Sequence, residues 1–286
     1  MSATPRGHNV VPKVPPRIHA LLARDAKTAV VIRRGPSRCV AVVGWDRTND
    51  EFTVGQWFYG RIYERRCDLS PDGQHLVYFA MNGRWNSEVL GSWTAVSKAP
   101  YIKALGLWPK GDCWNGGGLF ISNEKFWLNS GLHQHATIHE APGLEHQSEC
   151  PWPSHYGGEC PGVYYVRLQR GGWRLVDHRL DGAGGGITHF SKRVNDYWSL
   201  HKFAHETINN PVGRGCYFDE HSLENDKTQE FIACPDWEWA DVDGERMVWA
   251  SDGVLFAGRP ERKGIVGTKE LFDFANISYE RLKAPY

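Results

Sequence analysis

The feature that most constrains this chain is a strand–turn–strand unit that recurs along it. Its clearest copy has the turn Ser70-Pro71-Asp72-Gly73, followed by an apolar run from His75 to Ala80. Asp-Gly between two such runs is a strong hairpin signal, because Gly accepts the positive φ of a tight turn. Similar turns stand at Asn123-Glu124, Asn195-Asp196 and Asp243-Gly244. The recurrence predicts a protein built from repeated β-hairpins.

Composition supports the same fold class. The 286 residues include 31 Gly and 16 Pro, which interrupt the chain too often for long helices. Thirteen Trp, eleven Tyr and twelve Phe supply broad side chains that pack well between sheets. We therefore expect a single all-β domain, since all-β folds of this length are often one unit.

The spacing of the turns favours a propeller. Asp72 to Asn123 is 51 positions, Asn123 to Asn195 is 72, and Asn195 to Asp243 is 48. A four-stranded propeller blade occupies about 40 to 50 residues. The long interval contains a strand-poor stretch, 131–161, which is interpreted as an insertion. With the strands expected over 28–58, the pattern predicts about five blades of four antiparallel strands, with four or six blades as alternatives.

Two segments resemble a known superfamily. Leu69–Tyr78 resembles the inner hairpin of TolB-type and WD-repeat propellers, whose blades often carry a Ser-Pro-Asp-Gly turn before an apolar strand. Asp241–Gly258 is similar to the last strands of such a blade. Only one copy has the full turn and no Trp-Asp dipeptide ends a blade, so no subfamily is indicated. The resemblance implies binding of proteins, peptides or small ligands at the ends of the propeller, and some members are enzymes.

The sequence predicts a different kind of structure at each end of the chain. Residues 1–27 are predicted to be a lead-in, with four prolines before a short helix over Ile18–Arg24. Residues 264–274 are predicted to form a final strand pair that pairs with the strands near Thr28 and closes the ring. The alternative is an ordinary terminal strand on an open sheet.

Charge and cysteine content limit the function classes. The chain has 33 acidic and 33 basic residues and a pI near 7.2, so neither a nucleic-acid nor a membrane partner is expected. The first residues lack the apolar core of a secretory signal. Seven cysteines form no Cys-x-x-Cys pair, and their odd number argues against a full disulfide framework. These features predict a protein of the reducing cytoplasm.

The stretch 131–161 holds the densest set of candidate ligands. His133 and His135 would share one face of a strand, and His139 would complete three nitrogen ligands for a divalent metal such as zinc. The spacing matches no known zinc motif. As a ligand-binding loop, the same stretch would use His133, His135, His139, His146, Trp152 and His155. A functionally quiet connection is the remaining alternative.

Other motifs give weaker indications. His201 and His205 are interpreted as structural residues of a strand, because the Glu of a zinc-protease helix does not follow the first histidine. The glycine runs 116–118 and 182–186 lack the Lys-Ser or Lys-Thr of a phosphate loop, and are interpreted as tight passages between sheets. The tryptophans of 237–249 are predicted to pack in the core.

Catalysis has no motif of its own in the sequence. The chain has no Gly-x-Ser-x-Gly element and no cysteine with a cue for a lowered pKa. We therefore predict a non-catalytic propeller that recognises a protein or a small ligand through loops such as 131–161 and 209–228. The alternative is a glycan- or ester-directed hydrolase that uses loop carboxylates, with or without a histidine-bound metal.

Overall fold

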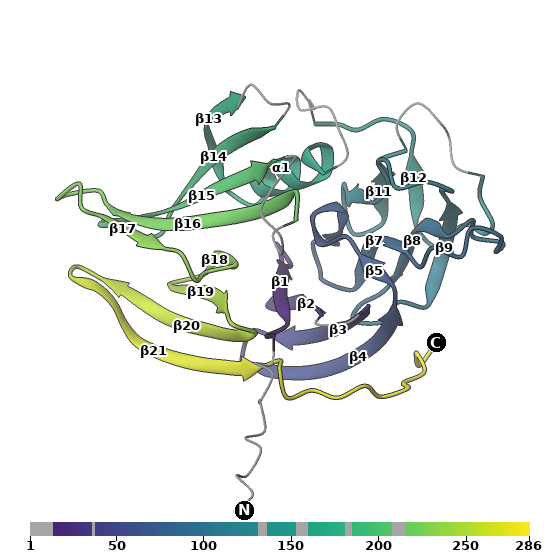
Figure 1. The fold of residues 1–286 in the computed structure, drawn as a ribbon, viewed down its shortest axis with the longest axis horizontal. Helices are drawn as coiled ribbons and strands as arrows, with labels where there is room; N and C mark the ends of the chain where they lie inside the picture. The colour runs from purple at the N-terminus through teal and green to yellow at the C-terminus, as the bar shows by residue number, and fades with distance from the viewer. Residues whose placement is uncertain (1–13, 36–37, 131–135, 153–159, 181–184, 208–214) are drawn as a thin grey trace, which may run out of the picture.

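The computed structural model describes residues 14–35, 38–130, 136–152, 160–180, 185–207 and 215–286. Its elements form five sheets around a common centre (Figure 1). Sheet 1 contains β1 (Arg17–Leu22), β2 (Thr28–Arg34), β3 (Cys39–Asp46) and β4 (Glu51–Tyr59). Sheet 2 contains β5 (Arg61–Ile62), β6 (Asp68–Leu69), β7 (His75–Met81), β8 (Ser92–Lys98) and β9 (Ala104–Pro109).

The remaining sheets differ in size. Sheet 3 contains β10 (Gly118–Phe120), β11 (Lys125–Leu128) and β12 (Glu145–Gln147). Sheet 4 contains β13 (Arg174–Leu180), β14 (Gly186–Arg193), β15 (Trp198–Glu206), β16 (Tyr217–Asn225) and β17 (Phe231–Cys234). Sheet 5 contains β18 (Trp239–Asp243), β19 (Arg246–Ser251), β20 (Val254–Glu261) and β21 (Gly264–Asp273). The predicted all-β fold with about five blades is confirmed.

All four predicted hairpins are present. The Asp72-Gly73 turn joins β6 to β7, and Gly73 has a φ of 75°. The turns near residues 123, 195 and 243 join β10 to β11, β14 to β15, and β18 to β19. Ser70 stabilises the first turn, because its hydroxyl accepts from His75 N at 2.9 Å and donates to Asp72 at 2.6 Å. Local turn chemistry therefore sets these registers.

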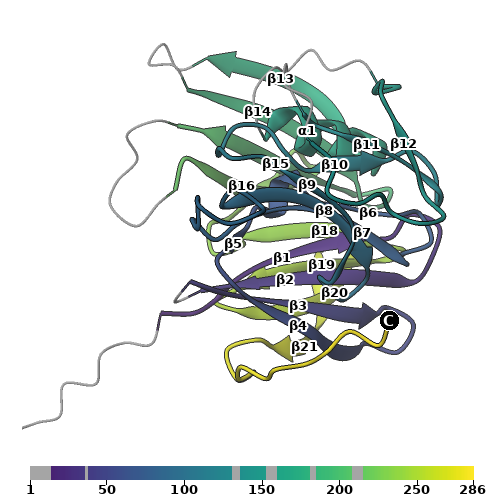
Figure 2. The ribbon, with the colours of Figure 1, turned by 90° about the vertical axis from the view of Figure 1, so that its right-hand side faces the viewer.

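Hydrophobic packing links the sheets in ring order (Figures 1 and 2). One buried cluster joins sheet 5 to sheet 1, a second joins sheets 1 and 2, and a third joins sheets 2 and 3. Sheet 3 then packs on helix α1 (Pro161–Arg170), and α1 packs on sheet 4, which packs on sheet 5. The helix thus lies where sheets 3 and 4 would otherwise meet.

Three sequence expectations about individual elements are wrong. Ile18–Arg24 is no helix: β1 occupies Arg17–Leu22 and pairs with β2. Its side chains are buried on both faces, with Ile18 and Ala20 in one cluster and Leu21 in another, so tertiary packing overrides helix propensity. The first sheet therefore begins within the stretch expected to be a lead-in. In the described part of the stretch 209–228, from residue 215 onward, the expected loop is wrong, because β16 occupies Tyr217–Asn225.

The predicted pairing of the last strand is the third error. β21 pairs with its neighbour β20, and no strand of sheet 1 pairs with β21 among the described residues. Sheets 5 and 1 are joined by side chains instead. Trp45, Trp239 and Val248 share their buried cluster, and Arg33 Nε donates to Phe274 O at 3.3 Å.

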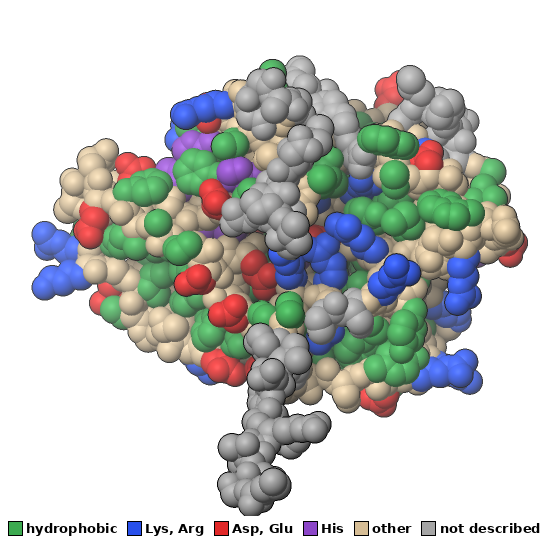
Figure 3. All heavy atoms as spheres, viewed as in Figure 1, with side chains coloured by type: hydrophobic (Ala, Val, Ile, Leu, Met, Phe, Trp, Pro, Cys, Tyr) green, Lys and Arg blue, Asp and Glu red, His purple; other side chains and the backbone are tan. Residues whose placement is uncertain are grey.

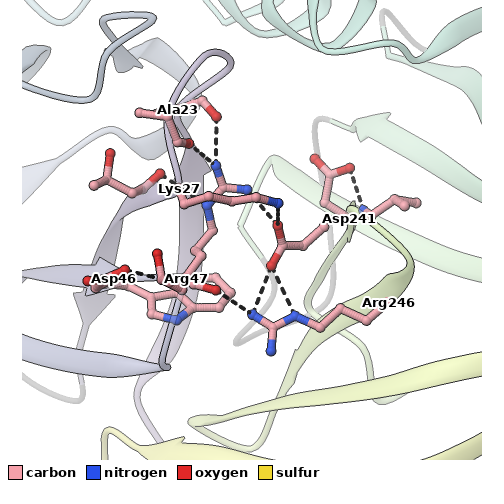
Figure 4. Close-up of polar contacts among 12 residues, drawn as sticks. Ala23, Lys27, Asp46, Arg47, Asp241 and Arg246 are labelled. Carbon is pink, nitrogen blue, oxygen red and sulfur yellow. Dashed lines mark hydrogen bonds and ion pairs between the residues drawn. The ribbon is translucent and has the colours of Figure 1, made fainter.

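Charged residues add to this junction (Figure 4). Asp243 in β18 accepts from Arg47, which follows β3, at 2.7 Å and from Arg246 at 2.8 Å. Arg246 also donates to Asp50 at 2.8 Å. Arg47 further donates to the carbonyls of Ala23 and Ala26 in the β1–β2 loop. The network fixes this loop.

Candidate functional site

A cavity with a volume of about 760 Å³, here called the main cavity, lies at the end of β1, in the middle of the ring. Its walls come from β1 and the β1–β2 loop, β6, the C-terminal half of α1, one residue each of β14 and β15, and β18. A volume of this size is typical of pockets for small molecules. A second cavity of about 320 Å³ lies at the beginning of β1, and His19 lines both.

The wall of the main cavity is rich in charged side chains. Seven of its residues are cationic and four are acidic, an excess of three positive charges in a chain whose net charge is zero. They are Arg24, Lys27, Arg47, Arg167, Arg170, Lys192 and Lys202, with Asp25, Asp68, Asp241 and Asp243. A cavity with partly buried walls strengthens such a field compared with an exposed surface.

The carboxylates deep in this cavity are all engaged in ion pairs. Both oxygens of Asp68 accept from Arg170, at 2.6 and 2.7 Å, and Asp68 also accepts from Phe120 N. Asp241 accepts from Lys192 at 2.7 Å. Asp243 belongs to the network of Arg47 and Arg246. The fourth acidic residue, Asp25, is exposed in the β1–β2 loop.

A buried polar layer separates the two cavities. Asp219 accepts from Arg65 at 2.6 Å and from the Tyr164 hydroxyl, and lies 3.6 Å from Lys202 Nζ. Burial alone would raise the pKa of Asp219, but the charges of Arg65 and Lys202 outweigh it and lower the pKa. Burial and the Arg167 charge hold the pKa of His19 well below its usual value, so His19 is neutral at pH 7.

The second cavity contains two carboxyl groups in contrasting environments. Burial raises the pKa of Glu238 to about 7, and its Oε1 accepts from Ile18 N at 2.9 Å. Burial would also raise the pKa of Glu64, but nearby positive charges, Arg34 first among them, hold it at about 2. At neutral pH one carboxyl is therefore half protonated and the other is ionised.

The Glu238 pKa implies a pH-dependent stability. Folded Glu238 keeps its proton up to about pH 7, whereas an unfolded Glu loses it near 4.3, so ionisation opposes folding. The contribution of Glu238 to the free energy of unfolding should fall as pH rises from about 4.3 through 7. We expect Glu238→Gln to be more stable than wild type at pH 8, with a smaller difference at pH 4.5, as measured by urea denaturation.

The control for this experiment is Glu230→Gln, because Glu230 is exposed. Its stability should follow that of wild type at both pH values. A constant offset between Glu238→Gln and wild type across this range would contradict the raised pKa.

The predicted histidine site is only partly within the described residues. His133, His135 and His155 lie outside them, so the three-histidine metal site stays a prediction. His139 is exposed and forms a bridge to Leu107. His146 in β12 stacks on Phe126, and Trp152 packs against the Arg170 guanidinium at 4.9 Å. In the described part of the chain, no three His, Cys, Asp or Glu side chains are arranged to hold a metal ion.

His201 and His205 lie on β15, as predicted. His201 Nδ1 is 2.8 Å from His189 Nε2, and its Nε2 is 3.0 Å from Glu224. His205 is 3.0 Å from Glu220 and stacks on Phe218. The space-filling view shows histidines gathered among hydrophobic side chains over this sheet (Figure 3). Burial lowers the pKa of His201 and of His189, which favours their neutral forms.

The glycine run 116–118 and the tryptophans are structural, as expected. A Cβ on Gly117 would lie 1.9 Å from Arg66 O, so the backbones pass too closely for any other residue. The run 182–186 is described only from Gly185 onward. Trp239 and Trp249 are buried, and Trp237 stacks on Trp249 with a centroid distance of 4.8 Å.

Sequence reasoning missed the main cavity and helix α1. The helix had a local signal, since Pro161 begins it and Val163, Tyr164, Val166 and Leu168 are buried on it. The main cavity had no local signal, because its charged residues come from seven separate segments of the chain. The helix has ten residues, and no helix of the described chain is long and apolar enough to cross a membrane.

Comparisons with known proteins identify no family for this chain. No protein-family model matches the chain, and no curated protein matches its sequence. Among solved structures, the chain is similar to an uncharacterised protein from Listeria monocytogenes EGD-e. The alignment covers 91% of this chain and 67% of that one, at 6% identity and a TM-score of 0.25.

Proposed function

We propose that this protein is a non-catalytic β-propeller that binds a small polar ligand in its main cavity. The observation that carries the proposal is a 760 Å³ space at the centre of the ring whose wall is rich in charged side chains. Such groups fix the orientation of a ligand through directed hydrogen bonds. The binding surface proposed from the sequence is thereby moved from the outer loops to the cavity.

Binding fits this cavity better than hydrolysis does. A glycosidase requires one carboxylic acid to donate a proton and a second carboxylate to act as base or nucleophile. Asp68, Asp241 and Asp243 are instead held by Arg or Lys side chains at 2.6 to 2.8 Å. Their oxygens are thus already occupied by fixed cations in this cavity.

Covalent labelling of Lys27 tests ligand binding in this cavity. Lys27 lines the cavity, yet its side chain is 63% exposed and so reacts with an amine acetylating reagent. We expect a bound compound to slow acetylation of Lys27 to about a tenth at ten times its Kd, in proportion to occupancy. Peptide mass spectrometry with a panel of neutral sugars, nucleosides, amino acids, organic acids and phosphates would measure this.

Lys263, exposed on the β20–β21 turn, is the internal control and should react at an unchanged rate. A panel in which no compound protects Lys27 selectively would contradict the proposal.

The second candidate function is hydrolysis at the smaller cavity. Glu238 with a pKa of about 7 and Glu64 with a pKa of about 2 have the protonation states that an acid and a base or nucleophile need. Turnover of glycosides or esters by the wild type, abolished in Glu238→Gln, would promote this function. Absence of turnover across the panel would leave the binding proposal.

A further inference from the structure

The charge of one buried carboxylate, Asp68, acts on three of the arginines that line the main cavity, of which Arg170 alone binds it. Arg170 binds both oxygens of Asp68 and donates to Phe120 O at 2.6 Å. Arg167 donates to the carbonyls of Glu64 and Cys67 and lies 2.9 Å from His19 Nε2, so its contacts are neutral groups. Arg24 stands exposed in the β1–β2 loop, with no hydrogen bond or ion pair from its guanidinium to the described residues.

The charges of these arginines act on one another. Burial lowers the pKa of Arg24 and of Arg167, and the Arg170 charge lowers both further. Asp68 opposes this effect at both residues. Asp68 thus acts on three guanidinium groups, and neither Arg24 nor Arg167 makes an ion pair with any of the described residues. This arrangement leaves a local positive charge in a partly buried space.

Arg170 also has unused hydrogen-bonding capacity. Its side chain is only 7% exposed, and its Nε has no hydrogen-bond partner among the described residues. A buried donor without a partner is unfavourable, because it has lost its hydrogen bonds to water. Arg170 also lines the main cavity, so an anion bound there would add an acceptor close to this guanidinium.

The C-terminus of α1 accounts for part of the cluster, though not for all of it. Arg167 and Arg170 stand in the last turn of the helix, where cations interact favourably with the helix dipole. That dipole corresponds to roughly half an elementary charge. Arg24 comes from a different element, the β1–β2 loop, so the helix end does not explain its approach to Arg170.

We propose that the cavity binds an anion carrying phosphate or carboxylate groups, held by Arg24, Arg167 and Arg170. Guanidinium groups bind both anions through paired N–H donors, and they do so most strongly where water is partly excluded. Lys27 lines the same cavity, and the wall as a whole has an excess of three positive charges, so a ligand with more than one anionic group fits best. The inference rests on the proposed function and names its ligand class.

Isothermal titration calorimetry with tripolyphosphate and with citrate tests the inference. At low salt we expect one molecule of at least one of these anions to bind per chain, with an affinity that falls as salt is added. Arg24→Glu should weaken binding at least about ten-fold, because a charge-assisted contact is replaced by repulsion. The two probes distinguish a phosphate-bearing from a carboxylate-bearing ligand.

Arg84→Glu is the matched control, since Arg84 is exposed and does not line the cavity. It should change the affinity less than two-fold, roughly the effect of one distant charge. Both substitutions are on the surface, so each variant should fold, and circular dichroism would verify this.

Binding of neither anion, or equal weakening in both variants, would overturn the inference. If a neutral compound protects Lys27 while neither anion binds, the ligand class is wrong and the binding function stands. If no compound protects Lys27 and neither anion binds, both proposals are wrong.

Discussion

Asp219→Asn should destabilise the protein by about 3–5 kcal/mol, the range typical of breaking a buried ion pair from one side. Arg65 and Lys202 would then stay buried without their counter-charge, since their side chains are 7% and 1% exposed. Asparagine has nearly the same shape and can still accept from the Tyr164 hydroxyl, so lost charge is the main change. The midpoint of urea denaturation at pH 7 measures the effect.

Asp196→Asn provides the matched control. Asp196 also pairs with an arginine, Arg193, at 2.9 Å, but the two side chains are 86% and 68% exposed. Surface pairs of this kind contribute at most about 1 kcal/mol. If the two variants lost similar amounts of unfolding free energy, Asp219 would not balance the buried charges of Arg65 and Lys202 as described.

Gly117→Ala should destabilise the protein by about 2–5 kcal/mol, through two separate effects. Gly117 has a φ of 76°, a conformation that costs an L-residue about 1–2 kcal/mol. In addition, the new Cβ would lie 1.9 Å from the backbone oxygen of Arg66. Backbone cannot rotate away as a side chain can, so overpacking adds about 1–3 kcal/mol. Thermal or urea denaturation would measure the total.

Gly143→Ala separates the two effects. Gly143 has a φ of 79°, but a Cβ there would meet no atom within 4 Å. It should therefore lose only the conformational part, about 1–2 kcal/mol. Equal losses at the two glycines would mean that the approach of the Arg66 carbonyl has no energetic effect.

The hairpins could be predicted because each is specified within about ten residues. Asp72-Gly73 and Asp243-Gly244 carry their turn geometry in the turn residues themselves. β1 could not be recognised in this way. Its strand conformation depends on pairing with β2 and on burial against two different clusters, which no local pattern contains. In isolation, the residues of β1 favour a helix.

The candidate site was harder to predict than the fold. His146 and Trp152 were predicted to bind a ligand because they stand in a histidine-rich stretch. In the structure, His146 stacks on Phe126 and Trp152 packs against Arg170. The residues that form the cavity are spread from position 19 to 244. Arg24 and Arg170 look like ordinary surface charges in the sequence. Only the ring arrangement brings them together.

The way in which the main cavity is assembled has a thermodynamic consequence. Its wall takes residues from sheets 1, 2, 4 and 5 and from α1, so no single sheet retains the site when the ring opens. A ligand would therefore bind the folded state and have no counterpart site in the unfolded chain. Binding and folding are then linked: a ligand at 100 times its Kd would add about 2.7 kcal/mol to the free energy of unfolding. That is close to the loss expected for Gly117→Ala, so the ligand would act as a structural component of the ring.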